Sequence, residues 1–274
     1  MKILICADME GISGVVNWDQ VSPGHAEYAR FRRIMTAEVN AAIEGVIEAG
    51  AQAVVVADGH AGGYNLLVEE LDPRVRLNSG NSAPFAMVQG IDASFDGAIF
   101  IGYHACAGSQ YAVLDHTWSS ARVANVWLNQ KLVGEIGLNA AVCGNFNVPV
   151  LMISGDQTAC GEGQELLGPI SVAVVKQATS RTSAECLPLE VSQRKVCEAA
   201  AKAVSQLSTG QKPDPFQPEK PVTVTIEFFN ALMADQASNL PGSNRLDGRR
   251  IEFRATDMLE AYAAFQAAVD LART

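Results

Sequence analysis

The sequence predicts an α/β fold, a mainly parallel sheet flanked by helices, with a smaller C-terminal α/β portion. Two observations predict it. Short apolar runs recur along the chain without an alternating polar face, as expected of strands that are covered on both sides. Longer stretches rich in Ala, Glu and branched aliphatic residues lie between these runs and are typical of helices. A chain of 274 residues, 48% of them hydrophobic, is long enough to bury the core of such a fold.

The expected elements alternate along the chain. Buried strands are expected at 2–8, 51–58, 96–104, 149–156 and 169–177. Helices are expected at 24–49, 135–147, 156–167 and 188–207. The first helix ends at Ala49-Gly50, a common helix stop. Two alternating runs on either side of Asn129-Gln130-Lys131 predict a hairpin at 123–135 instead.

The segment 208–221 differs in composition from the rest of the chain. It contains four prolines, which predict an extended linker or surface crossing. Strands at 222–229 and 249–257 and a final helix at 258–272 are expected after it. The segment is therefore the candidate boundary between a larger domain, 1–208, and a C-terminal strand-helix portion, 222–274. That portion is either a small second lobe or an addition to the first domain.

Composition excludes several classes of function. Twenty basic and 30 acidic residues give a formal net charge of −10, which disfavours nucleic acid and anionic membranes as partners. No run of about 18 apolar residues predicts a transmembrane helix, and the first residues do not resemble a signal peptide. The six cysteines form no CxxC pair, so reduced thiols in a cytoplasmic protein are expected.

Polar residues able to bind metal or protons follow the predicted strands. Asp8 and Glu10 follow the first strand, His60 follows the second and His104 follows the third. The carboxyl ends of parallel strands meet at one edge of a sheet, where ligands bind. Carboxylate and imidazole together suit zinc or another first-row divalent ion. The two acids, one residue apart, can face the same way because a metal lies between them.

A structural interpretation competes with the metal site at each position. An aspartate after a strand is often a helix N-cap or a turn former, and a single histidine is often only hydrogen-bonded. This applies to Asp156 after the fourth strand. It applies also to Asp58, which either orients a ligand imidazole or forms a turn, and of the two we prefer the orienting role. His25, in SPGHAEY, is expected to lie on the surface. The joint pattern over three strand ends favours the metal site.

Five motifs in the same order resemble the D-aminopeptidase family of binuclear zinc metallopeptidases: DMEGISG at 8–14, DGHAGG at 58–63, GYHACAG at 102–108, DHTWS at 115–119 and VGEIGLNA at 133–140. Further similarity at 148–156, 175–181 and 255–262 extends the resemblance over nearly the whole chain. It implies a metal-binding catalytic domain within 1–208 and two zinc ions per chain. It also implies a ring of ten subunits, a homodecamer.

The resemblance also implies a set of site residues. The metal ligands would be Asp8, Glu10, His60, His104 and Glu135. In the family arrangement, Asp8 lies between the ions, Glu10 and His104 bind one ion, and His60 and Glu135 bind the other. His116, in DHTWS, would be the catalytic residue. Read from the residues alone, Glu135 is an acid that opens a helix, where the helix dipole favours negative charge.

The implied activity is hydrolysis of short peptides that begin with a D-amino acid, of the D-Ala type. Metal-activated water is expected to attack the amide, since no GxSxG nucleophile motif occurs. Physical grounds favour an acid/base or electrostatic role for His116 over a nucleophilic one. The alternatives are another metal-dependent hydrolase, an amidohydrolase or phosphoesterase, and a non-catalytic metal- or solute-binding protein. Cys106 is either a buried, inert cysteine or a reactive thiol near the metal.

Overall fold

The larger of two sheets contains the strands that carry the predicted site. The computed structural model describes residues 1–80 and 84–273. The strands of this sheet are β1 (Lys2–Ala7), β2 (Ala53–Asp58), β3 (Arg76–Asn78), β4 (Gly97–Ile101), β7 (Val150–Asp156), β8 (Ser171–Ser180) and β9 (Ser183–Cys186). Their order is β3-β2-β1-β4-β7-β8-β9, and every neighbouring pair is parallel except β8 and β9. The prediction of a mainly parallel α/β sheet is confirmed.

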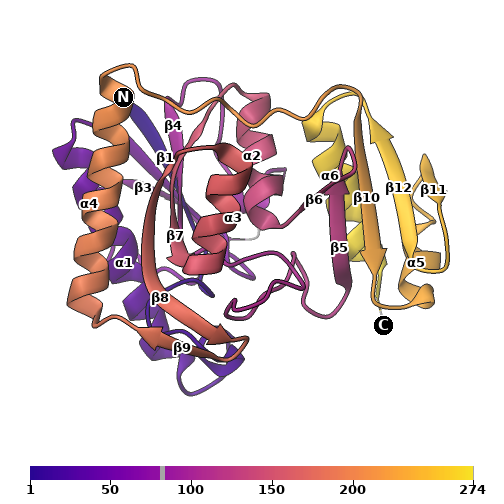
Figure 1. Ribbon diagram of the computed structural model, residues 1–274, viewed down its shortest axis with the longest axis horizontal. Helices are drawn as coiled ribbons and strands as arrows, with labels where there is room; N and C mark the ends of the chain where they lie inside the picture. Colours follow the sequence, from indigo (N-terminus) through magenta and orange to yellow (C-terminus); the bar gives the residue numbers. More distant parts are fainter. Residues whose placement is uncertain (81–83, 274) are drawn as a thin grey trace.

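Helices cover both faces of this sheet (Figure 1). These helices are α1 (Tyr28–Glu48) and α4 (Leu189–Ser208) on one face and α2 (Glu135–Asn145) and α3 (Gln157–Leu167) on the other. Helices α5 (Ala231–Ala237) and α6 (Met258–Leu271) pack on the smaller sheet, and η1 (Trp18–Gln20) and η2 (Ala86–Val88) are short 3-10 turns. Ile3 and Ile5 of β1 belong to the core under α1 and α4, whereas Leu4 and Cys6 belong to the core that includes α2. Strand β1 is thus buried on both faces, as its continuous apolar run predicts.

The smaller sheet is antiparallel and lies beside the larger one (Figure 1). Its strands are β5 (Val123–Leu128), β6 (Lys131–Val133), β10 (Val222–Phe228), β11 (Ser243–Arg245) and β12 (Arg250–Ala255). Strands β5 and β6 are the predicted hairpin, closed by Asn129 and Gln130 at φ of 47° and 69°. Because β10 pairs with β5, this sheet takes strands from both sides of segment 208–221. A separate C-terminal domain stays a prediction.

Helix α6 joins the two sheets through a common core. Tyr262 and Phe265 of α6 are buried together with Leu138 of α2 and Phe228 of β10.

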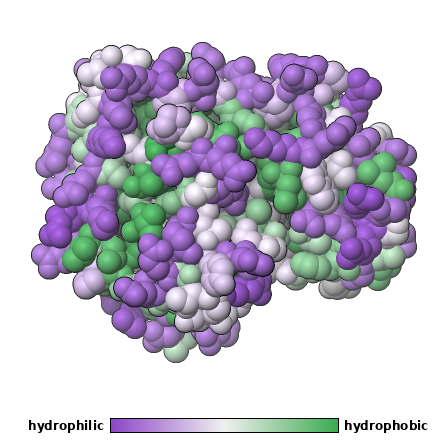
Figure 2. Space-filling model, in the orientation of Figure 1, coloured by the Kyte–Doolittle hydropathy of each residue, from purple (hydrophilic) through white to green (hydrophobic). Residues whose placement is uncertain are grey.

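Hydrophilic residues dominate the face of the molecule seen in Figure 2, with hydrophobic residues in smaller patches between them. Within residues 1–80 and 84–273, no helix is long and apolar enough to cross a membrane.

The segment after β1 crosses the end of β4 at very close range. The N–H of Gly11 donates a hydrogen bond to the carbonyl of Gly102 at 2.7 Å. A Cβ placed on Gly11 would lie 2.0 Å from the carbonyl oxygen of Tyr103. Gly102 itself has a φ of 72°, in the left-handed region that favours glycine. These two glycines let the residues that follow β1 pass directly over the end of the neighbouring strand.

We expect Gly11→Ala to destabilise the protein, because the new methyl group meets backbone atoms that have no room to move. A cost of about 1–3 kcal/mol in the free energy of unfolding is typical of such overpacking. Gly161→Ala is the matched control, since nothing lies within 4 Å of a Cβ at this position inside α3. It should stabilise the helix by about 0.5–1 kcal/mol. Chemical denaturation measures both, and equal stability of the two variants would contradict the expectation.

Candidate functional site

The structure brings the five predicted ligands together at the carboxyl edge of the larger sheet. Strands β1, β2 and β4 are neighbours, so their ends place Asp8, Glu10, His60 and His104 side by side. Glu135 reaches them from the other sheet, as the first residue of α2 directly after the hairpin β5–β6. All five side chains are buried, with exposed fractions between 1% and 8%. Titratable groups buried at this density require compensation of their charge.

Short distances connect the five side chains. His60 Nδ1 lies 3.3 Å from Asp8 Oδ1 and 3.0 Å from Glu10 Oε2. His104 Nε2 lies 3.5 Å from Asp8 Oδ2 and 3.2 Å from Glu135 Oε1. Asp8 thus lies between the two imidazoles, with Glu10 beside one and Glu135 beside the other. That Asp8 lies between two ions, as the resemblance implies, stays a prediction.

Each histidine of the site has one ring nitrogen held by a backbone carbonyl. His60 Nε2 lies 2.8 Å from Val21 O, and His104 Nδ1 lies 3.0 Å from Ala105 O. A carbonyl only accepts, so the nitrogen facing it donates and the other nitrogen has a free lone pair in the neutral ring. That free nitrogen points into the carboxylate cluster in both residues. Metal-ligating histidines are oriented in this way, with the outer nitrogen fixed and the inner one open.

Three buried atoms of the cluster lack a hydrogen-bond partner among the described residues. They are Asp8 Oδ2, Glu10 Oε2 and His104 Nε2. Ligand atoms of the same three residues lie within 4.8 Å of one another. Unpaired buried polar atoms are costly unless something else satisfies them. A divalent cation between two carboxylates and an imidazole does so, and the donor set is one that zinc accepts.

A second set of possible ligands consists of His104, His116 and Glu135, again within 4.8 Å of one another. His116 therefore lies close enough to serve as a ligand as well as a catalytic group. The assignment of His60 and Glu135 to one ion stays a prediction. The contacts place His60 with Asp8 and Glu10, and they place Glu135 with His104 and His116.

The charges of the site are strongly coupled. Burial lowers the pKa of His60, but the Glu10 and Asp8 carboxylates raise it well above its usual range. Burial likewise opposes the charged form of His104, whose pKa is nevertheless raised well above the usual range by Glu135. Burial and the neighbouring Glu10 raise the pKa of Asp8 to about 7. The cluster therefore holds protons that a cation can displace.

His116 has the opposite electrostatic environment. Burial and the neighbouring His104 lower its pKa, so the ring is neutral at pH 7. Its ring stacks on His104, with centroids 4.0 Å apart and planes inclined by 12°. The edge of Trp18 contacts it from another side, with centroids 5.3 Å apart. Its Nδ1 lies 2.9 Å from Leu114 O, which leaves Nε2 free to accept a proton.

Asp115, the neighbour of His116, connects the loop that carries His116 to the turn between β8 and β9. Arg181 Nε donates to Asp115 Oδ1 at 2.7 Å, and the second carboxylate oxygen of Asp115 accepts from Gly108 N at 2.7 Å. Leu114 and Trp118 on either side have φ of 50° and 65°, an uncommon conformation for large side chains. Trp118 N donates to Glu135 Oε1 at 2.7 Å, which connects the loop to the ligand cluster.

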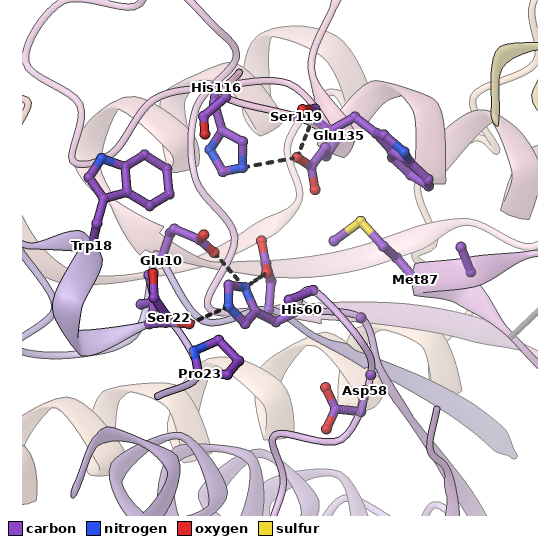
Figure 3. A pocket seen from close by; sticks show the side chains of 18 of the residues that line it. Glu10, Trp18, Ser22, Pro23, Asp58, His60, Met87, His116, Ser119 and Glu135 are labelled. Atoms are coloured by element: carbon purple, nitrogen blue, oxygen red, sulfur yellow. Dashed lines mark hydrogen bonds and ion pairs between the residues drawn. The ribbon is translucent and has the colours of Figure 1, made fainter. Parts of the chain in front are cut away.

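A cavity of about 580 Å³ opens onto the cluster. Asp8, Glu10, His60, His116 and Glu135 all line it, and Figure 3 shows the last four pointing toward its interior. Residues from η1 and from α6 complete the wall. A cavity of this size admits a small peptide or another molecule of similar volume.

Asp58 and Asp156 do not belong to the cluster. Both oxygens of Asp58 are occupied by the loop after β2, since Oδ2 accepts from Asn65 N at 2.6 Å and Oδ1 from Asn65 Nδ2 at 2.7 Å. Asp58 is therefore a turn former, and the preference for a role in orienting a ligand imidazole was wrong. Asp156 caps α3 by accepting from Thr158 N and Ala159 N. For Asp156, the interpretation as a helix N-cap is therefore confirmed.

His25 and Cys106 also lie outside the cluster. His25 is exposed, as expected, and pairs with Asp19 at 3.1 Å. Cys106 is partly buried beside Ser109, with 3.5 Å between Sγ and Oγ. Burial and the neighbouring Glu162 raise the pKa of the Cys106 thiol to about 11, which favours the inert alternative.

Reasoning from strand ends misses Glu135, because this residue follows a strand of the other sheet. The only local indication is a buried acid between Gly134 and Gly137 at a helix start. The environment of Gly134 is crowded, since a Cβ there would lie 2.6 Å from the Cβ of Cys106. Close packing at this point brings the start of α2 against the loop after β4.

Comparison with known proteins gives a consistent result. A family model described as D-aminopeptidase matches residues 1–267. A D-aminopeptidase of Bacillus subtilis (strain 168) is 40% identical over 273 residues, which cover 99% of this chain and 98% of the relative. Among solved structures, the Zn-dependent D-aminopeptidase DppA from Bacillus subtilis, a self-compartmentalizing protease, superimposes with a TM-score of 0.96 at 40% identity. The match covers 100% of this chain and 99% of that one. The chain therefore belongs to the D-aminopeptidase family of peptidases.

Proposed function

We propose that the protein is a zinc-dependent aminopeptidase that hydrolyses short peptides with an N-terminal D-amino acid, of the D-Ala type. The observation that carries the proposal is the set of buried, unpaired atoms on Asp8, Glu10 and His104 in a site that opens into a cavity. Membership of the family and the zinc dependence of the related DppA support it. His116 adds a neutral imidazole beside the five proposed metal ligands. A protein that only binds metal or a solute would not need this additional group.

Two zinc ions per chain are part of the proposal. Asp8 would contact both, while Glu10, His60, His104 and Glu135 would complete the two sites. Bound zinc polarises a peptide carbonyl and lowers the pKa of water to about 7. The protein fixes the ligand imidazoles through the carbonyls of Val21 and Ala105.

His116 would transfer protons during hydrolysis. Its lowered pKa keeps Nε2 unprotonated at neutral pH, so this atom can take a proton and later give it to the leaving amine. Its stacking on His104 and its contact with Trp18 hold the ring at the cavity wall. The aromatic contacts also limit the access of water to that side of the ring.

The proposal extends to assembly. The related DppA is described as self-compartmentalizing, which implies that its chains enclose a chamber. We infer that this chain likewise forms a homo-oligomeric ring, with ten subunits as the expected number.

We expect the zinc-loaded protein to hydrolyse D-Ala-D-Ala faster than L-Ala-L-Ala. N-acetyl-D-Ala-D-Ala should resist, because an aminopeptidase requires a free amine. Release of alanine measured by chromatography gives the rates. Nitrophenyl phosphate and a cyclic amide serve as substrates for the alternative hydrolase classes, and turnover of either without turnover of the peptides would refute the proposed function.

We expect His116→Ala to lower the rate of peptide hydrolysis by roughly 10²–10⁴, the typical contribution of one acid/base group. Zinc content, measured by mass spectrometry, should stay at the wild-type value. His25→Ala is the control, since this exposed histidine pairs only with Asp19 among the described residues. Loss of one zinc ion from His116→Ala would instead make the residue a ligand, as its proximity to His104 and Glu135 permits.

We expect zinc binding to the metal-free protein at pH 7 to release about two to three protons per chain, one from each of His60 and His104 and a fraction from Asp8, whose pKa is raised to about 7. The raised pKa values of His60 and His104 mean that both rings are protonated before zinc binds. Release should decline as the pH rises through these raised values, because the rings then lose their protons without zinc. A pH indicator in weak buffer measures the effect. His60→Ala should release about one proton fewer, and an unchanged release would contradict the assignment.

A further inference from the structure

Lys176 is a buried cation whose side-chain hydrogen bonds, in the described part of the chain, all go to the segment that follows β1. The residue belongs to β8 and is only 1% exposed. Its Nζ donates to the carbonyls of Glu10 at 2.6 Å, Val15 at 2.8 Å and Ile12 at 3.0 Å. An ammonium group has three donors, so these three carbonyls satisfy all of them. No ion pair joins this side chain to a carboxylate in the described part of the chain.

The segment held in this way carries two of the metal ligands. Residues 8–15 form neither helix nor strand. Asp8 N still donates to Ile101 O at 2.8 Å, but no regular hydrogen-bond ladder reaches Glu10. Gly11 anchors the segment on Gly102, at the end of β4. Ser13 N anchors it on α1 by donating to the buried Glu38 Oε2 at 3.1 Å. Among these anchors, Lys176 is the one that binds the carbonyl oxygen of Glu10, on the other side of the peptide group whose N–H, that of Gly11, is bound by Gly102.

The position of the Glu10 peptide decides where the Glu10 carboxylate lies. Glu10 Oε2 has only an ion-pair contact with His60 Nδ1, at 3.0 Å, among the described residues, and His60 is itself a candidate ligand, so no group outside the cluster sets the place of this oxygen. A metal ligand must stay within about 0.2 Å of its bonding distance, which requires support from the surrounding groups. A bond to the Glu10 carbonyl supplies that support from β8, a strand separated from β1 by β4 and β7.

We propose that Lys176 is a positioning residue of the metal site, which acts through the Glu10 carbonyl to hold Asp8 and Glu10 at one ion. The inference rests on the proposed function for the identity of that ion. A purely structural role would only stabilise the fold. The positioning role predicts in addition a specific loss of metal affinity and a mobile segment 9–16.

The test uses Lys176→Met, which removes all three donors and keeps an unbranched side chain. Titration of the metal-free protein against a fluorescent zinc chelator should show affinity weakened by about 10–100-fold, as for other groups that support metal ligands. The visible absorption of the cobalt-substituted protein should change with the coordination geometry. Hydrogen exchange of the peptide that contains residues 9–16 should become faster in the metal-free protein.

Val204→Ala is the control for stability alone. Val204 is fully buried in α4, and its truncation should cost about 1–3 kcal/mol; in the described part of the chain no hydrogen bond joins α4 to residues 8–15. Its zinc affinity should equal that of the wild type. Equal weakening in Lys176→Met and Val204→Ala would overturn the inference, as would unchanged affinity in Lys176→Met. If Lys176→Met does not fold, Lys176→Gln takes its place, and wild-type affinity in that variant would equally overturn it.

The outcome separates the inference from the proposed function. If the wild type binds zinc but hydrolyses no peptide, the proposed function fails, and the affinity of Lys176→Met still decides the positioning role. If the wild type binds no zinc, the hydrogen exchange of residues 9–16 in Lys176→Met decides whether Lys176 holds this segment. Exchange at 9–16 that is as slow in the variant as in the wild type would then refute the role of Lys176.

Discussion

Burial of carboxylates and imidazoles at one edge of a parallel sheet is the constraint on which the rest of this structure depends. Asp8, Glu10 and Glu135 bring negative charge to a place from which water is largely excluded, and His60 and His104 compensate it only in part. Such a cluster persists only when every surrounding group is fixed. The backbone carbonyls behind the histidines, the close glycine contacts after β1 and the buried Lys176 all serve that requirement.

Much of this arrangement follows from the sequence because it depends on strand topology. Continuous apolar runs identify β1, β2 and β4, and parallel neighbours place their carboxyl ends at one edge. The amino-acid sequence alone therefore predicts Asp8, Glu10, His60 and His104 as a group. The hairpin β5–β6 is equally predictable, because two alternating runs flank a short turn. These features depend on local sequence patterns, so the sequence alone is sufficient to predict them.

The remaining features depend on contacts between distant segments. Glu135 enters the site because β5 and β6 join β10 in another sheet, and no local pattern in the sequence reveals that pairing. Asp58, like Asp8, lies at the carboxyl end of a parallel strand, but Asn65 binds both oxygens of its carboxylate through hydrogen bonds. Lys176 lies on a strand whose sequence gives no reason to expect a buried amine that reaches residue 10. Only tertiary structure distinguishes these cases.

The cavity wall draws on both sheets, and this has a consequence for how such a protein diversifies. The ligands after β1, β2 and β4 are confined by packing on every side, so substitutions around them are poorly tolerated. Gln266 and Asp270 of α6 line the same cavity from a helix attached to the smaller sheet. Their side chains can vary without disturbing the strands that hold the ligands. Selectivity for the substrate can therefore diverge in evolution through residues of α6 while the ligands after β1, β2 and β4 are preserved.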